Sequence, residues 1–311
     1  MMELTEWIET IFFARHETFP PRYGWLKKGY DAVVEHGSDV FDSANAIEYL
    51  GVGKNMVRAV RFWAMAYKIL EPVGDKKTLR IGGQMQVTDL GNQLFNDQTG
   101  WDPYLEDIGS LWLLHWQLCM PPILATAWPL VLNLSLSGKF TSKDLATAVT
   151  ERMSQHYKSK NVALASIEKD ASCFIRMYGS SKSQNSDEIE CPFTQLGLLS
   201  SDGDRQAFSF NIDEKNTLPN QIFLAACFQY AAHTQPTLRT LSLHKLVYGF
   251  NSPGVLFRIS ETGAGRRLDE GVMTIPGVAF IESYGNRQLQ FEQEPDRIAQ
   301  QLLSQYYTQN N

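Results

Sequence analysis

The fold is decided by residues 42–69, which carry the sequence DSANAIEYLGVGKNMVRAVRFWAMAYKI. Residues 42–50 predict a short capped helix, Gly51-Val52-Gly53 a tight turn, and Lys54 to Ile69 a longer helix. This order of elements is typical of a helix-turn-helix. On the longer helix, Lys54, Arg58 and Arg61 fall within about 60° of one another, while the apolar side chains share another arc. The stretch therefore predicts one basic face and one buried face.

The residues that follow predict a β-hairpin that would act as a wing. Thr78 to Ile81 and Gln84 to Val87 alternate in hydrophobicity, and the glycines between them allow the positive φ of a primed turn. From residue 54 to residue 80 the chain has seven basic and two acidic side chains. An ordinary solvated basic face is the alternative explanation. We expect a winged helix-turn-helix that contacts DNA phosphates through Lys54, Arg58, Arg61 and Arg80.

The whole chain has the composition of a globular protein, with 311 residues, 43% of them hydrophobic, and a formal net charge of −6. At roughly 100 to 200 residues per domain, this length predicts two or three domains. All seven tryptophans lie in the first 128 residues, which favours a boundary near residues 136–142. We expect a mostly helical α+β fold. A winged-helix DNA-binding domain with a following aromatic helix would occupy residues 1–138. A helical domain with small β-hairpins would occupy residues 139–311, and its hairpins and helices could form a second winged-helix-like unit.

Two shorter patterns predict one further helix and one further strand. Helical periodicity extends to residues 6–13, near the N-terminus, and strand-like alternation to residues 255–259. From Arg239 to Arg267 the chain has five basic residues and one acidic residue, which could form a second phosphate-contacting surface. The glycines there match neither a Walker loop nor a dinucleotide fingerprint, so no nucleotide site is expected.

The sequence also predicts a cytoplasmic protein without a membrane partner. No apolar run reaches the roughly 20 residues that a membrane span requires. The acidic N-terminus lacks the basic region of a signal peptide. Four scattered cysteines fit reduced thiols better than disulfides or a zinc site.

Three carboxylates lie close together at the start of an aromatic helix. Asp102, Glu106 and Asp107 fall within the sequence WDPYLED, residues 101–107. Asp102 is placed to cap the helix, and acids in a first turn interact favourably with the helix dipole. The alternative is that the three converge on Mg²⁺, which needs only one or two carboxylates beside water and phosphate. We take them as candidate metal ligands and catalytic acids, and we expect His115, further along this helix, to be a core residue.

A second dense segment is HETFPPRYGWLKKG, residues 16–29. His16 and Glu17 place a potential general base beside a carboxylate, so they are the second candidates for catalysis. Arg22, Lys27 and Lys28 add positive charge that suits DNA phosphates. The alternative is a proline-braced entry into a helix whose lysines point into water.

Several sequence motifs of the chain resemble those of the DUF4007 family. They are HETFP (16–20), RYGWLKKG (22–29), GVGKNMV (51–57), WDPYLED (101–107), LWLLHW (111–116) and NSPG (251–254). The resemblance implies a Mg²⁺-dependent nickase that cuts one DNA strand in bacterial, phosphorothioation-based defence against phage. It also implies three partners: a cysteine desulfurase, an ATPase and an ATP pyrophosphatase.

The resemblance assigns no catalytic residue, since no complete nuclease motif is present in the chain. The candidates above therefore rest on the chemistry of their side chains. Two other functions remain open at this point. One is a non-catalytic DNA-binding adaptor that recruits the sulfur-modification machinery, and the other is a transcriptional regulator that uses the same helix-turn-helix.

Overall fold

The computed structural model describes residues 7–8, 10–74, 83–136, 138–157, 162–179, 191–201 and 207–310. Helices dominate these residues, and their strands form three small antiparallel sheets. The predicted class, mostly helical α+β, is confirmed. The helix expected at residues 6–13 is wrong for residues 10–13, which are irregular.

The predicted helix-turn-helix region contains two helices joined by the expected turn. α3 (Ala46–Leu50) ends at Gly51, whose φ of 60° is left-handed, and α4 (Lys54–Ala66) begins after Gly53. Glycine tolerates this backbone conformation because it has no Cβ. α4 ends earlier than predicted because Lys68 is also left-handed, with a φ of 61°, and the chain turns there into a strand. Around this pair lie α2 (Trp25–His36), η1 (Val40–Asp42) and α5 (Asp89–Phe95).

The hairpin after α4 differs from the predicted one. β2 (Met85–Val87) pairs with β1 (Leu70–Pro72) in antiparallel register, so the strand partner begins directly after α4. This register buries Leu70 and Met85 against the core. Residues 78–81, including Arg80, lie outside the described residues.

The middle of the chain is helical. It contains α6 (Ile108–Cys119), α7 (Ala127–Leu132), α8 (Ser142–His156), α9 (Leu164–Tyr178), η2 (Pro192–Leu196), β3 (Leu199–Ser200) and β4 (Ser209–Phe210). The last third contains α10 (Asn220–Thr234), β5 (Thr240–Ser242), α11 (Leu243–Tyr248), α12 (Pro253–Phe257), α13 (Glu261–Gly271), η3 (Val272–Thr274), β6 (Val278–Ser283), β7 (Asn286–Phe291) and α14 (Pro295–Asn310). The strand expected at 255–259 is wrong, because Ser252 caps a helix there by accepting a hydrogen bond from the amide of Val255.

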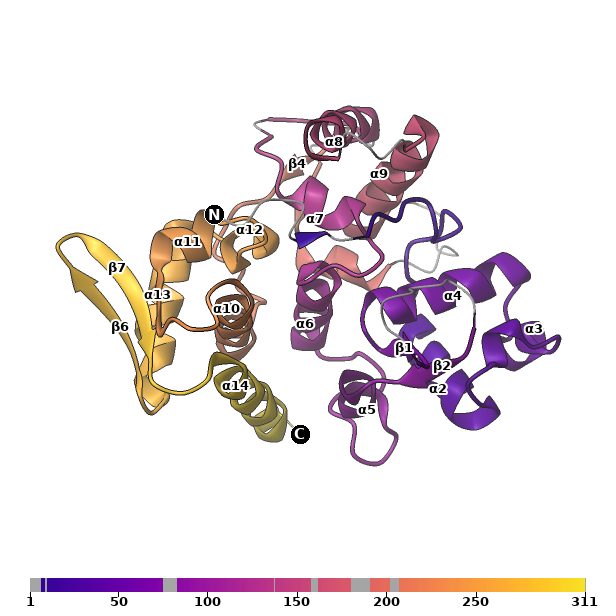
Figure 1. The fold of residues 1–311 in the computed structure, drawn as a ribbon, viewed down its shortest axis with the longest axis horizontal. Helices are drawn as coiled ribbons and strands as arrows, with labels where there is room; N and C mark the ends of the chain where they lie inside the picture. Colours follow the sequence, from indigo (N-terminus) through magenta and orange to yellow (C-terminus); the bar gives the residue numbers. More distant parts are fainter. Residues whose placement is uncertain are drawn as a thin grey trace.

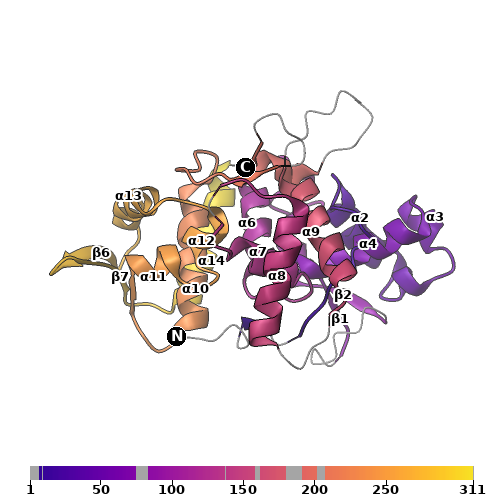
Figure 2. The ribbon, with the colours of Figure 1, turned by 90° about the horizontal axis from the view of Figure 1, so that it is seen from above.

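The elements form two groups on either side of α6. Helices α2 to α5 lie on one side, and α10 to α14 with the β6–β7 hairpin lie on the other (Figure 1). Seen from above, the α8–α9 pair lies across the middle of the molecule (Figure 2). Side chains link segments far apart in the sequence, since Trp101 stacks on Tyr307 of α14 with ring centroids 4.6 Å apart.

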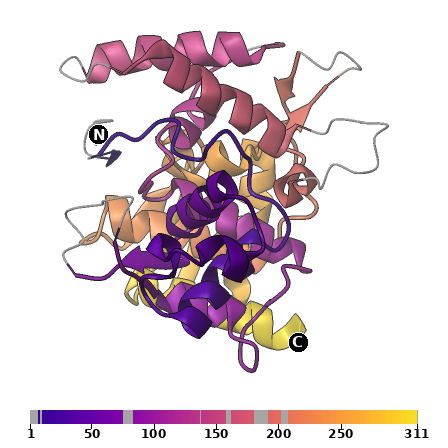
Figure 3. The same cartoon turned by 90° about the vertical axis from the view of Figure 1, so that its right-hand side faces the viewer.

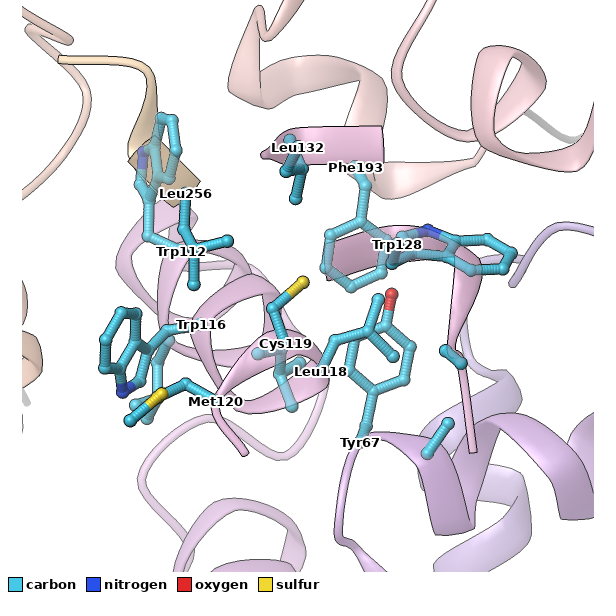
Figure 4. Packing of buried hydrophobic residues seen from close by; sticks show 14 of the residues in the cluster. Tyr67, Trp112, Trp116, Leu118, Cys119, Met120, Trp128, Leu132, Phe193 and Leu256 are labelled. Carbon is cyan, nitrogen blue, oxygen red and sulfur yellow. The ribbon is translucent and has the colours of Figure 1, made fainter. Parts of the chain in front are cut away.

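Helix α6 forms the centre of the hydrophobic core. Its side chains lie between Leu256 of α12 on one side and Tyr67, Trp128 and Phe193 on the other (Figure 4). All four cysteines are buried and free of disulfides. Because α6 contacts both groups, its apolar side chains hold them in one continuous core.

His115 of α6 lies within this core, as predicted. It is fully buried, and its Nδ1 and Nε2 lie 2.8 Å from the Tyr178 hydroxyl and from the carbonyl oxygen of Leu256, respectively. Burial lowers the pKa of the imidazole to about 4. The ring is therefore neutral at pH 7, where it serves the core by hydrogen bonding.

We expect the protein to lose stability as the pH falls from about 6.5 to about 4, because the unfolded chain takes up a proton at His115 before the folded chain does. The full effect is on the order of 3 kcal/mol. Urea unfolding between pH 7 and pH 4.5 measures it. His115→Gln should be less stable at pH 7 but less sensitive to pH than the parent; equal pH dependence in both proteins would contradict this assignment.

Candidate nucleic-acid interface

A groove opens between the N-terminal segment and the predicted helix-turn-helix. It encloses about 640 Å³, and its walls come from residues 15–17, residues 41–47 and the first turns of α4. The charged side chains that line it are Arg15, Glu17, Asp42, Lys54, Arg58 and Arg61. The structure thus brings together two features that are separate in the sequence, the HETFP segment and the basic helix.

The open side of the groove is basic. Arg15, Lys54 and Arg58 are exposed, and the Arg58 side chain keeps 56% of its surface accessible. Its Nη1 lies 3.6 Å from Oε1 of Glu17, which is too far for a hydrogen bond, so this surface pair is weak. A DNA phosphate could therefore compete with Glu17 for Arg58. Arg15 was not predicted, although it directly precedes His16 in the sequence.

Arg61 does not belong to this exposed face, which corrects the prediction that it contacts phosphates. It is only 4% exposed. Its Nη1 donates to Oδ1 of Asp42 at 2.9 Å, and its Nη2 donates to the carbonyl oxygen of Gly83 at 2.5 Å. The other carboxylate oxygen of Asp42 accepts the amide of Gly83. Arg61 therefore holds η1 against the chain that leads into β2.

His16 lies behind the groove wall and not in the groove. It is fully buried among aromatic rings, with its ring 5.9 Å from those of Trp63 and Trp128. Its Nε2 lies 2.8 Å from Oδ1 of Asp170 in α9. A residue without solvent access cannot reach a phosphate in the groove, so the prediction that His16 acts directly on DNA is not supported. Its contacts give it a positioning role for the neighbouring Arg15 and Glu17.

The segment that carries these groove residues is strained and tied down. Ala14, Glu17 and Thr18 all have positive φ values, of 56°, 49° and 65°. Such conformations are costly for residues with a side chain, and they persist only where surrounding contacts enforce them. The enforcing contacts come from α9: Asp170 accepts the amide of Ala14 at 2.8 Å, and Arg176 donates to the carbonyl oxygen of Thr18.

The segment therefore runs between two layers of the fold, with α8 and α9 on one side and α2 to α4 on the other (Figure 3). On the α4 side, the indole nitrogen of Trp63 donates to the carbonyl oxygen of Phe19 at 2.9 Å. Sequence reasoning did not identify Asp170 as a functional residue, because it lies 154 positions from His16. The fold alone brings the two together.

The three predicted metal ligands are used differently from the prediction. Asp102 is 7% exposed, and its two carboxylate oxygens accept the amides of Glu106 at 2.9 Å and Asp107 at 3.1 Å. Asp107 caps α6 by accepting the amide of Gly109, and the same oxygen accepts the hydroxyl of Tyr306. Its other oxygen is buried without a hydrogen-bond partner among the described residues. Glu106 points into solvent.

Asp102 and Asp107 therefore stabilise the start of α6, whereas Glu106 is exposed beside them. Across the described ranges, no group of three or more His, Cys, Asp or Glu side chains is arranged to hold a metal. The capping alternative accounts for both carboxylate oxygens of Asp102 and for Oδ1 of Asp107, but it leaves the buried Oδ2 of Asp107 unexplained. The prediction of a metal site at Asp102, Glu106 and Asp107 is not supported by their geometry.

We expect Asp102→Ala to lower the free energy of unfolding by about 2 kcal/mol, because two backbone amides lose a charged acceptor. Glu106→Ala, at an exposed position next to the same turn, should have little effect. Thermal unfolding of both variants measures the difference. Both should bind DNA like the parent at 20 °C; a stable Asp102→Ala variant that loses Mg²⁺-dependent activity would restore the metal-site prediction.

Three other predicted DNA contacts, Arg22, Lys27 and Lys28, do not line the groove. Lys27 is neutralised, since its Nζ lies 2.5 Å from Asp31 and 2.7 Å from Asp97. Lys28 lines a separate hollow of about 370 Å³ with Tyr104, which is 71% exposed. The guanidinium of Arg22 stacks over the rings of Phe19 and Trp25, at 5.7 and 5.5 Å. The hollow that Lys28 lines also contains the acidic Asp31 and Glu35, so a DNA contact at Lys28 stays a prediction.

No helix in the described part of the chain is long and apolar enough to cross a lipid bilayer. Among curated protein sequences, none matches the chain. Two solved structures do: a crystal structure of magnesium ion-bound SspB and a crystal structure of SspB. Each has 34% sequence identity and a TM-score of 0.87, and the alignment covers 96% of this chain and 88% of the SspB chain.

The family comparison agrees with the structural one. The family of proteins of unknown function DUF4007 matches residues 13–307. This range includes the N-terminal segment that is hydrogen-bonded to α9, the basic groove, α6 and most of α14. The chain belongs to the DUF4007 family.

Proposed function

We propose that the chain is a Mg²⁺-dependent nicking endonuclease that cuts one strand of duplex DNA during phosphorothioate modification in bacterial defence against phage. Its proposed partners are duplex DNA and the cysteine desulfurase, ATPase and ATP pyrophosphatase of the sulfur-modification system, in the cytoplasm. The observation that carries the proposal is the basic groove between residues 15–17 and α4.

The groove suits a DNA backbone for electrostatic reasons. Arg15, Lys54 and Arg58 present three cations at its open side, although the whole chain has a net charge of −6. Affinity for DNA comes mainly from cations that neutralise phosphates and release counterions. The hydrogen bonds of Asp170 in α9 hold the segment that carries Arg15 and Glu17 in place before DNA binds, so little conformational entropy is lost on binding.

Magnesium is part of the proposal because of the family resemblance and the magnesium ion-bound relative. Asp102 and Asp107 do not fit this role, since their oxygens are occupied or enclosed. Glu17 fits better, because it lines the groove and contacts Arg58 only weakly. Proteins commonly hold Mg²⁺ with one or two carboxylates plus substrate phosphates. When bound, the ion would neutralise phosphate charge and lower the pKa of a water molecule.

The second candidate is a non-catalytic adaptor that binds DNA for the sulfur-modification machinery. It is favoured by a specific observation, the structural use of the predicted acidic ligands Asp102 and Asp107. The adaptor would use the same groove for DNA. The two candidates therefore differ in chemistry and not in binding.

Conversion of supercoiled plasmid to open circle separates the two. The nickase should produce open circle with MgCl₂ and none with EDTA, whereas an adaptor would bind the plasmid in both buffers without cutting it. Glu17→Gln should reduce nicking at least tenfold while DNA affinity stays within about twofold, because it removes one carboxylate from a groove whose cations remain. Full nicking by this variant would exclude Glu17 as the groove carboxylate.

A further inference from the structure

The last third of the chain has the element order of a second winged helix. α10 is followed by β5, then by α11, α12 and α13, and then by the β6–β7 hairpin. The three strands form one antiparallel sheet in the order β5-β7-β6, so the hairpin pairs back onto the strand between the first two helices. In DNA-binding proteins of this kind, the last helix enters the major groove. The corresponding helix here is α13.

We infer that this unit is a docking surface for a protein partner whose contact surface is net positive, and that it does not bind DNA. The inference rests on the proposed function only for the choice of partners to test. It replaces the expectation that residues 239–267 form a second phosphate-contacting surface.

The exposed surface of α13 is mainly acidic. Its exposed side chains include three acids, Glu261, Asp269 and Glu270, of which Asp269 is paired with Arg287. Arg266 is paired with Glu214 at 2.5 Å. Arg267 points into the protein, where its guanidinium donates to the carbonyl oxygens of Glu214, Lys215 and Leu218. The basic residues that the sequence suggested for this helix are therefore used inside the protein or neutralised at its surface.

The β6–β7 hairpin projects beyond the body of the molecule (Figures 1 and 2). Residues 278–286 contain no lysine or arginine but do contain Glu282. Arg287, at the start of β7, is paired with Asp269 at 2.6 Å and lies over the Phe280 ring. A wing that contacts phosphates needs free cations. This hairpin presents none within the part of it that the structure describes.

Exposed apolar side chains lie in the hairpin and beside it. Tyr284 at the tip of the hairpin is fully exposed, Ile281 is 36% exposed, and Met273 beside the hairpin is 78% exposed. The positive φ values of Tyr284 and Gly285, 50° and 77°, form the tight turn that presents the ring. Tyrosine and methionine are enriched in protein interfaces, and exposed tyrosines are frequent hot spots. The net acidic surface of α13 and the hairpin then favours a partner with a basic contact surface.

The test is biolayer interferometry of the full chain against the purified cysteine desulfurase, ATPase and ATP pyrophosphatase proposed above. At least one should bind the parent. Tyr284→Ala and the double variant Glu261→Gln with Glu270→Gln should each weaken that binding at least tenfold and leave DNA affinity within about twofold. The matched control, Lys54→Glu with Arg58→Glu, should lose DNA affinity and keep the partner.

Several results would overturn the inference. They are no binding of the parent to any of the three proteins, equal binding by parent and variants, or loss of DNA affinity in Tyr284→Ala. The other occupant to test is a second copy of the chain, and sedimentation of the parent measures it. A parent dimer that dissociates in the Tyr284→Ala variant would assign the surface to self-association and overturn the inference. Failure of plasmid nicking would leave the inference intact, since it concerns the groove and not this face.

Discussion

The double variant Lys54→Glu with Arg58→Glu is expected to bind duplex DNA at least 100-fold more weakly than the parent. Both side chains are exposed at the open side of the groove, and reversing them replaces two attractions to phosphate with two repulsions. The slope of log affinity against log salt concentration should also fall by about two, because each phosphate contact contributes about one. Fluorescence anisotropy with a labelled duplex at several NaCl concentrations measures both quantities.

The matched control is Lys143→Glu with Arg297→Glu, which makes the same change in net charge at exposed positions on α8 and α14. It should reduce affinity only slightly, because those positions are away from the groove. Equal losses in the two double variants would mean that the overall charge governs binding. The assignment of the groove would then be wrong.

Asp170→Ala is expected to lower the free energy of unfolding by about 3 kcal/mol and to weaken DNA binding as well. Removing one partner of a buried polar pair commonly costs several kcal/mol, because the other partner stays buried without compensation. Here the substitution leaves both the His16 imidazole and the amide of Ala14 without their acceptor. The strained segment that carries Arg15 and Glu17 should then relax away from the groove.

Urea unfolding measures the first effect, and anisotropy at a temperature where the variant is folded measures the second. Asp170→Asn keeps an acceptor oxygen and should restore most of the DNA affinity. Asp144→Ala is the control, since it removes only the exposed capping-box carboxylate of α8 and should lower stability less than Asp170→Ala does, without changing DNA binding. Normal DNA affinity in a folded Asp170→Ala variant would show that the pair stabilises the fold without positioning the groove.

Local sequence patterns were sufficient to predict part of this structure. The glycine turn at 51–53 and the apolar arc of residues 54–69 predicted α3 and α4 because both signals depend on neighbouring residues. The expected strand at 255–259 failed for a local reason, because the serine and proline at 252 and 253 favour a helix start over the strand preference of the following residues.

The site was less predictable because its contacts are distant in sequence. On a helix wheel Arg61 shares a face with Arg58, but the chain around Asp42 and Gly83 folds over it and removes it from solvent. The carboxylates of residues 102–107 have the composition of a metal site, yet their oxygens are needed by local backbone amides. Asp170 was not predicted as a site residue, since its role depends on α9 packing against the N-terminal segment.

Site-specific photo-crosslinking tests most directly whether DNA lies in the groove. The four native cysteines are buried, so a new surface cysteine can be labelled selectively. Ala44→Cys, at an exposed position in the groove wall, would carry an azidophenacyl group, and Thr262→Cys on α13 would carry the same group on the opposing docking surface. We predict that a labelled duplex crosslinks to the first variant and not to the second, and that unlabelled duplex competes. Crosslinking only at position 262, or equally at both positions, would contradict the account.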